Sequence, residues 1–128
     1  MYFLKDESGL MARDKWHIET EGDRLTLSRL KAVRFDFSAK TMLPDASRRR
    51  VAHQIRQDMW RALQALRGFS PIVEITRENG HLRVKAGGQV EGGNFPRGKI
   101  ENMVAELLED VANRQRWLAF AAHRKAAL

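Results

Sequence analysis

The sequence predicts an α+β fold: an antiparallel sheet of about five strands with two long helices packed on one face, in the order β-β-β-α-β-β-α. Three observations predict it. Two segments alternate apolar and polar residues around two-residue turns, two longer segments carry apolar stripes at helical spacing, and no linker or low-complexity segment divides the 128 residues. We therefore expect one domain over residues 1–128, in which residues 71–128 weakly repeat the pattern of residues 15–70.

A hairpin is predicted first, after residues 1–14, which show no clear period and suit a short helix or an ordered arm. The turn is Gly22-Asp23, and glycine at its first position suits a type II′ turn. Pairing Glu21 with Arg24 and Ile18 with Leu27 then puts the apolar residues on one face. The apolar face comprises Trp16, Ile18, Leu25 and Leu27.

The next segments predict a third strand and a helix. Residues 33–37 (VRFDF) alternate apolar and charged side chains, as a strand does. Pro44 and Asp45 precede a span that contains no Gly or Pro, and Gly68 marks its C-terminal end. We therefore expect one helix over residues 45–67.

The second half of the chain predicts another hairpin and another helix. Asn79-Gly80 is a strong turn signal, and it sets three polar pairs across the strands. The pairs are Glu78 with His81, Thr76 with Arg83, and Glu74 with Lys85. The last helix is expected from about Lys99 to near the end of the chain. The outer face of the sheet is then exposed to solvent and carries no aromatic residue.

The composition excludes several classes of protein. The absence of cysteine removes disulfides, thiol nucleophiles and thiolate metal sites, and makes the cytoplasm the default location. The longest apolar run, residues 117–122, is far shorter than the ~20 residues that span a bilayer. The first ten residues contain no apolar run of the length that a signal peptide needs. We expect no membrane span.

Catalytic and metal-binding patterns are also absent from the sequence. No serine stands in a G-x-S-x-G motif, and no carboxylate falls on an apolar face, where burial would raise its pKa for acid catalysis. His17, Glu19 and Glu21 share one strand face, but their spacing favours a solvated surface over a metal site. We expect no enzyme activity, no metal and no cofactor.

The formal charge of +7 is concentrated in one segment. Residues 44–70 hold six basic and two acidic residues. On the predicted 45–67 helix, a second arc lies beside the apolar stripe and carries most of the candidate ligands for an anion. These are Arg49, His53, Arg56, Trp60 and Arg67. Guanidinium groups hold phosphates and an indole stacks on a base, which favours nucleic acid. The alternative is that arginine stems cover apolar surface and Trp60 caps the core.

The loop at residues 93–99 matches the spacing of a phosphate-binding loop, G-x-x-x-x-G-K. Ile100 stands where that motif needs Ser or Thr to hold magnesium, so the match is attributed to chance. Arg97 and Lys99 near a helix N-terminus remain candidates for holding a phosphate, with ordinary loop geometry as the alternative.

Two aromatic residues of the last helix, Trp117 and Phe120, fall outside its predicted apolar arc. That arc comprises Ile100, Met103, Val104, Leu107, Leu108, Val111 and Leu118. Trp117 and Phe120 therefore suit a partner surface, including a homodimer, or contact with the N-terminal arm that carries Tyr2, Phe3 and Leu4.

The element order resembles that of the small secretion chaperones, which are dimeric α+β proteins that hold partner polypeptides. Those chaperones are usually acidic, whereas this chain is basic. The sequence as a whole therefore favours a small non-enzymatic protein that binds an anionic macromolecule, nucleic acid before acidic protein. The alternative is a protein-binding assembly factor or chaperone-like homodimer.

Overall fold

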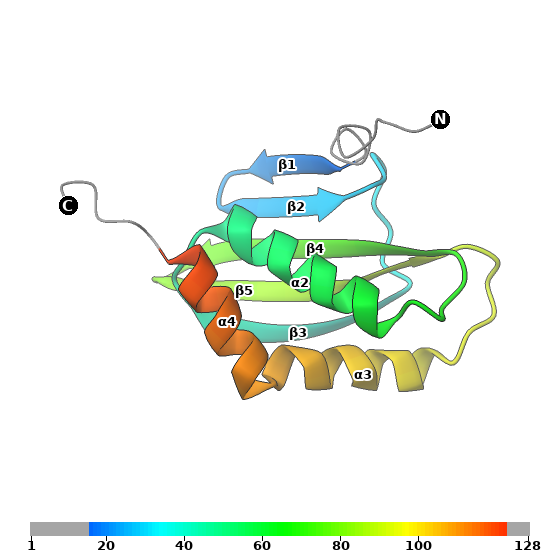
Figure 1. Cartoon of the computed structure of the whole chain (residues 1–128). Helices are drawn as coiled ribbons and strands as arrows, with labels where there is room; N and C mark the ends of the chain where they lie inside the picture. Colours follow the sequence, from blue (N-terminus) through cyan, green and yellow to red (C-terminus); the bar gives the residue numbers. More distant parts are fainter. Residues whose placement is uncertain (1–15, 123–128) are drawn as a thin grey trace, which may run out of the picture.

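The computed structural model describes residues 16–122, and the predicted N-terminal arm lies outside this range. Five strands and three helices make up the described part of the chain (Figure 1). They are β1 (His17–Glu21), β2 (Arg24–Ser28), β3 (Phe37–Pro44), α2 (Arg48–Ala62), β4 (Phe69–Glu78), β5 (His81–Val90), α3 (Arg97–Glu109) and α4 (Val111–Ala121). The α+β class and the antiparallel five-stranded sheet agree with the prediction.

The sheet has the strand order β1-β2-β4-β5-β3, and every neighbouring pair is antiparallel. Both predicted hairpins are confirmed in register, with Glu21 opposite Arg24 and Glu74 opposite Lys85. The two sequence halves interleave in this order, because β4 lies beside β2 while β3 lies beside β5.

The third strand is displaced from its prediction. It begins at Phe37 and runs to Pro44, so residues 33–36 precede it and Pro44 belongs to the strand. Because β4 and β5 lie between β2 and β3, the connection after β2 must cross the sheet to reach its far edge. On this crossing the Phe35 ring lies 4.3 Å from the Lys85 ammonium group. Lys85 projects from the face that the helices leave open, so Phe35, which lies outside the strands, packs against that face.

Helix α2 is shorter at both ends than the predicted span of 45–67. The Ser47 hydroxyl accepts a hydrogen bond from the Arg50 N–H (3.3 Å) and caps the N-terminus, while Asp45 forms an ion pair with Arg77 instead. The helix ends at Ala62, and residues 63–68 form turns that finish at Gly68, whose φ is +73°. Arg67 therefore lies beyond the helix.

The predicted last helix is two helices, α3 and α4, which meet at Asp110. Asp110 has an extended backbone (φ −64°, ψ 121°), and its carboxylate accepts from the Asn113 N–H at 2.9 Å. This side chain caps α4 and interrupts the helix. The break changes which residues face inward, so that Val111 is exposed and Trp117 is buried, the reverse of the prediction from a continuous helix.

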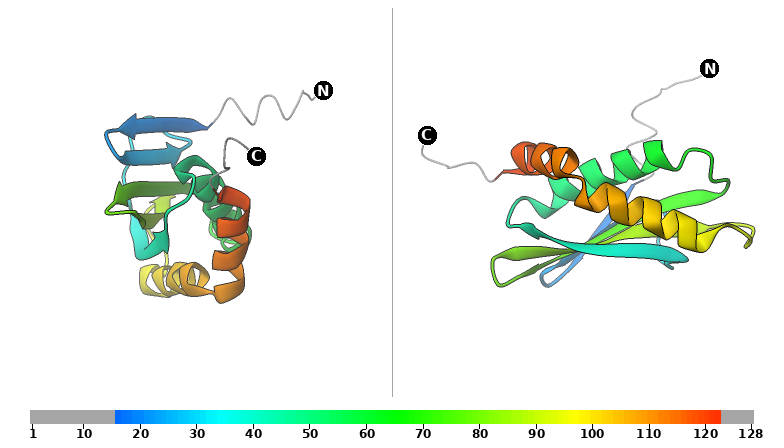
Figure 2. Two further views of the ribbon diagram at one scale, coloured as in Figure 1. Left: turned by 90° about the vertical axis from the view of Figure 1, so that its left-hand side faces the viewer. Right: turned by 90° about the horizontal axis from the view of Figure 1, so that it is seen from below.

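All three helices lie on one side of the sheet (Figure 2). Helix α2 packs on β4, α3 packs along β3, and α4 crosses the ends of α2 and α3. The core lies between these layers, and its largest buried side chains come from the sheet, α2, α3 and α4. They include Leu27, Phe37, Ile55, Met59, Ile75, Leu82, Leu108 and Trp117. The opposite face of the sheet carries no described helix.

Candidate nucleic-acid interface

One side of α2 carries four of the candidate ligands, spaced so that they fall on consecutive turns. Arg49 is exposed, His53 and Arg56 are partly buried, and Trp60 is 43% exposed. Val51, Ile55 and Met59 on the other side are fully buried, which fixes the rotation of the helix. The predicted arc of basic and aromatic residues is thus present from Arg49 to Trp60.

The strands add two residues to this side of α2. Trp16 lies just before β1, and the guanidinium carbon of Arg56 stands 4.5 Å from its ring centroid. Arg29 follows β2, and its guanidinium carbon stands 5.2 Å from the same ring. Two guanidinium groups therefore share one indole. We call Trp16, Arg29, Arg49, His53, Arg56 and Trp60 together the arginine–tryptophan surface.

A hollow of about 200 Å³ opens within this surface, lined by residues from β4, α2 and the ends of β1 and β2. The lining residues are Trp16, Arg29, Arg56, Trp60 and Pro71. The Trp60 ring stacks on the Phe69 ring, with centroids 6.0 Å apart and planes 17° apart. This contact explains why Trp60 is only partly exposed and holds its ring at the edge of the hollow.

The arginine–tryptophan surface is positive, and its arginines have no ion-pair partner among residues 16–122. No carboxylate of the described residues forms an ion pair with Arg29, Arg49 or Arg56. Burial, and then the charge of Arg29, lowers the pKa of Arg56. The Arg56 Nε is buried and has no hydrogen-bond partner among the described residues. Burial, and then the charges of Arg56 and Arg49, lowers the pKa of His53, which is therefore neutral at pH 7.

The structure does not bring the other three predicted anion ligands to the hollow. Arg67 is exposed in the turn between α2 and β4. Arg97 stands at the start of α3 and forms an ion pair with Glu101 at 3.4 Å. Lys99 borders a separate groove with apolar residues of α2 and α3, among them Leu66.

Trp117 differs from its predicted role, whereas Phe120 is exposed as expected. Trp117 is fully buried between α4 and α2, and its indole N–H donates to the Asp58 carboxylate at 2.7 Å. It is part of the core and is closed to a partner. Phe120 is 53% exposed, with the Arg50 guanidinium carbon 5.9 Å from its ring. Trp117 faces inward because the break at Asp110 changes which side of the helix is buried.

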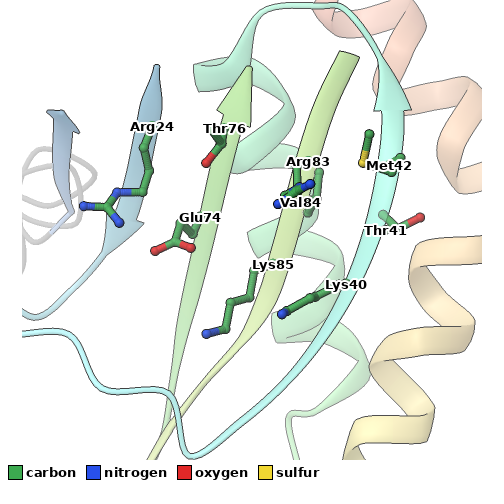
Figure 3. A pocket seen from close by; sticks show the side chains of 9 residues that line it. All are labelled: Arg24, Lys40, Thr41, Met42, Glu74, Thr76, Arg83, Val84 and Lys85. Carbon is green, nitrogen blue, oxygen red and sulfur yellow. The ribbon is translucent and has the colours of Figure 1, made fainter. Parts of the chain in front are cut away.

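Another hollow, of about 520 Å³, lies on the open face of the sheet (Figure 3). Its basic lining residues are Arg24, Lys40, Arg83 and Lys85. Carboxylates accompany most of these cations, since Arg24 pairs with Glu21, Arg83 pairs with Glu78 at 3.1 Å, and Glu74 lies opposite Lys85. An anion is therefore attracted less strongly here than at the arginine–tryptophan surface, although this hollow is larger.

Sequence reasoning missed Trp16 and Arg29 as members of the surface. Trp16 was expected on the apolar face of the first hairpin, which is correct, and that face abuts α2 at its edge. Arg29 follows the last residue of β2, and no local pattern marks it. The one available signal was the position of both residues at the same end of the hairpin, where Trp16 precedes β1 and Arg29 follows β2.

Within residues 16–122, no group of three or more His, Asp and Glu side chains is placed to hold a metal ion. The helices of this same range include none that is long and apolar enough to cross a membrane.

Comparisons of the chain with models of protein families, with curated proteins and with solved structures find no match. A function must therefore be inferred from the residues of this chain alone.

Proposed function

We propose that this protein is a non-enzymatic nucleic-acid-binding protein that engages its partner through the arginine–tryptophan surface. The observation that carries the proposal is the pair Arg29 and Arg56, whose guanidinium groups share the Trp16 ring without a carboxylate from the described residues. These two like charges repel each other, and Arg56 is partly buried. A phosphate placed between them offsets that repulsion and accepts charge-assisted hydrogen bonds from both.

The length of the surface favours a polymer over a small anion. Arg49 and Trp60 are eleven residues apart on one helix, which is about 16 Å along the axis. A single phosphate occupies only part of that length, whereas a polynucleotide presents one phosphate about every 3.4 Å of each duplex strand. Arg49 and Arg56 can therefore meet different phosphates of one chain.

The exposed ring separates nucleic acid from an acidic protein as the partner. Carboxylates of an acidic protein would pair with Arg49 and Arg56, but a carboxylate has no aromatic ring to stack on the indole of Trp60. A base offers a planar face to that indole, and aromatic stacking is a recurrent part of nucleic-acid binding. Both kinds of group in one surface suit a ligand that carries phosphates and bases.

The test is the double variant Arg49→Ala and Arg56→Ala, with binding to a labelled oligonucleotide followed by fluorescence anisotropy between about 50 and 200 mM salt. We expect the affinity to fall at least about tenfold at the lowest salt, because two charged contacts are lost. The slope of log K against log salt should decrease by about two.

The matched control is Arg24→Ala with Arg83→Ala, which removes two ion-paired arginines from the open face of the sheet. This control should retain nearly all of the affinity. Equal losses in both double variants, or no binding of any oligonucleotide to the unmodified protein at low salt, would refute the proposal.

A further inference from the structure

We propose that the hollow beside Trp60 is a base-binding subsite, so that the nucleic acid bound by this surface is single-stranded. This inference rests on the proposed function and narrows its ligand. It follows from three features of the hollow: its rigid ring, its size and the cations on one side of it.

The Trp60 indole is held in position before any ligand arrives. Its stacking on Phe69 restricts the ring, and 43% of the side chain remains exposed. Pro71, a rigid apolar residue of β4, also lines the hollow. A restrained ring loses little conformational freedom when a base stacks on it, so this arrangement is favourable for binding.

The size of the hollow suits one base. Its volume of about 200 Å³ equals the share of about seven water molecules in the liquid, at about 30 Å³ each. A single planar heterocycle is on this scale. A duplex would have to break one base pair and its stacking before a base could enter.

The cations stand where the backbone of such a nucleotide must pass. Arg29 and Arg56 line the same hollow as Trp60 and are held over the Trp16 ring, so that ring is already covered. Trp60 is then the ring that takes the base, and the two guanidinium groups take an adjoining phosphate. Recognition of unstacked bases on aromatic residues beside phosphate contacts is typical of single-strand binding.

The experiment compares a short single-stranded oligonucleotide, as DNA and as RNA, with the duplex of the same sequence. Trp60→Ala should weaken single-strand binding at least about fivefold, which is the lower end for loss of one stacked base. It should leave the salt slope unchanged, because no phosphate contact is lost. Trp60→Phe should restore most of the affinity, and the DNA and RNA arms show whether the 2′-hydroxyl matters.

Tryptophan fluorescence supplies a second measurement. Single-stranded ligand should quench the emission of the unmodified protein, and Trp60→Ala should remove most of that quenching. Trp117 is buried and contributes a constant background. Trp16 lines the same hollow beneath the two guanidinium groups and accounts for the quenching that remains. Phe120→Ala is the control variant, because it removes another exposed ring, which lies beside Arg50 instead of the hollow.

The outcomes separate the two proposals. If the duplex binds as tightly as the single strand and Trp60→Ala changes neither, the base subsite is refuted while nucleic-acid binding stands. If neither form binds at low salt, the proposed function itself fails. Loss of binding in Phe120→Ala equal to that in Trp60→Ala would also overturn the subsite.

Discussion

At the scale of single residues, Asp58 is a polar side chain of α2 that binds two side chains of α4. Its carboxylate accepts from the Trp117 indole N–H and from the Arg116 guanidinium, each at 2.7 Å. Trp117 is fully buried, so without Asp58 its N–H loses this acceptor in an apolar layer. A buried donor left without an acceptor costs more than the bond itself contributes.

We expect Asp58→Ala to lower the free energy of unfolding by about 1–3 kcal/mol. Urea denaturation followed by tryptophan fluorescence measures this directly. Asp58→Asn keeps an acceptor oxygen and should lose much less. Arg116 is half exposed, and Arg116→Ala should also have a small effect. An Asp58→Ala loss as small as that of Arg116→Ala would contradict this account of the buried N–H.

At the scale of elements, the break between α3 and α4 decides which residues of the last helix are buried. The last carbonyls of α3 have no partner within the helix and accept hydrogen bonds from side chains of α4. Asn113 donates to the Leu107 carbonyl, and Arg114 donates to the Leu108 carbonyl. Arg114 also donates to the Met42 carbonyl of β3, which ties the break to the sheet edge. These bonds stabilise a change of direction between the two helices that helical periodicity alone does not predict (Figure 1).

Asp110→Ala should destabilise the protein by about 0.5–2 kcal/mol, because the Asn113 N–H loses the oxygen that caps α4. Chemical denaturation measures the change, and Asp110→Ser, which restores a capping oxygen, is the control. If Ser and Ala give the same loss, the cap is not the origin of the effect.

At the scale of the whole molecule, β3 reaches the far edge of the sheet through a close approach of backbones. A Cβ at Gly87 would lie 2.0 Å from the Phe37 carbonyl oxygen, so the start of β3 packs where only glycine fits. The Asp36 N–H donates to the Gly88 carbonyl (2.8 Å), and the Asp36 carboxylate accepts from the Val90 N–H (2.8 Å). The hydrogen bonds from Arg34, and then the bond from the Val90 N–H, hold the pKa of Asp36 below its usual range.

Gly87→Ala should therefore lower the free energy of unfolding by more than about 2 kcal/mol, because β3 must shift away from β5. Gly98→Ala is the control: nothing lies within 4 Å of the added atom, and Gly98 is inside α3. That variant should be neutral or gain up to about 1 kcal/mol from helix propensity. Thermal melts of both variants test the contrast, and a neutral Gly87→Ala would refute the close approach.

One part of the candidate site could be predicted from the sequence, and another part could not. The spacing of Arg49, His53, Arg56 and Trp60 was sufficient to predict one helix side, because helical periodicity is a local property. The neighbours that complete the surface, Trp16 and Arg29, come from the ends of a hairpin whose position beside α2 depends on sheet order. No spacing in the chain encodes that order.

The sequence by itself determined both hairpins with their registers, the inward side of α2 and the excess of positive charge. Each of these depends on residues a few positions apart, where turn chemistry and periodicity act directly. Only the tertiary structure decided that Trp117 is core, that β3 lies at the far edge, and that two arginines share the Trp16 ring. Such outcomes depend on packing between distant segments, whose free energies outweigh local preferences and are not expressed in any short stretch of sequence.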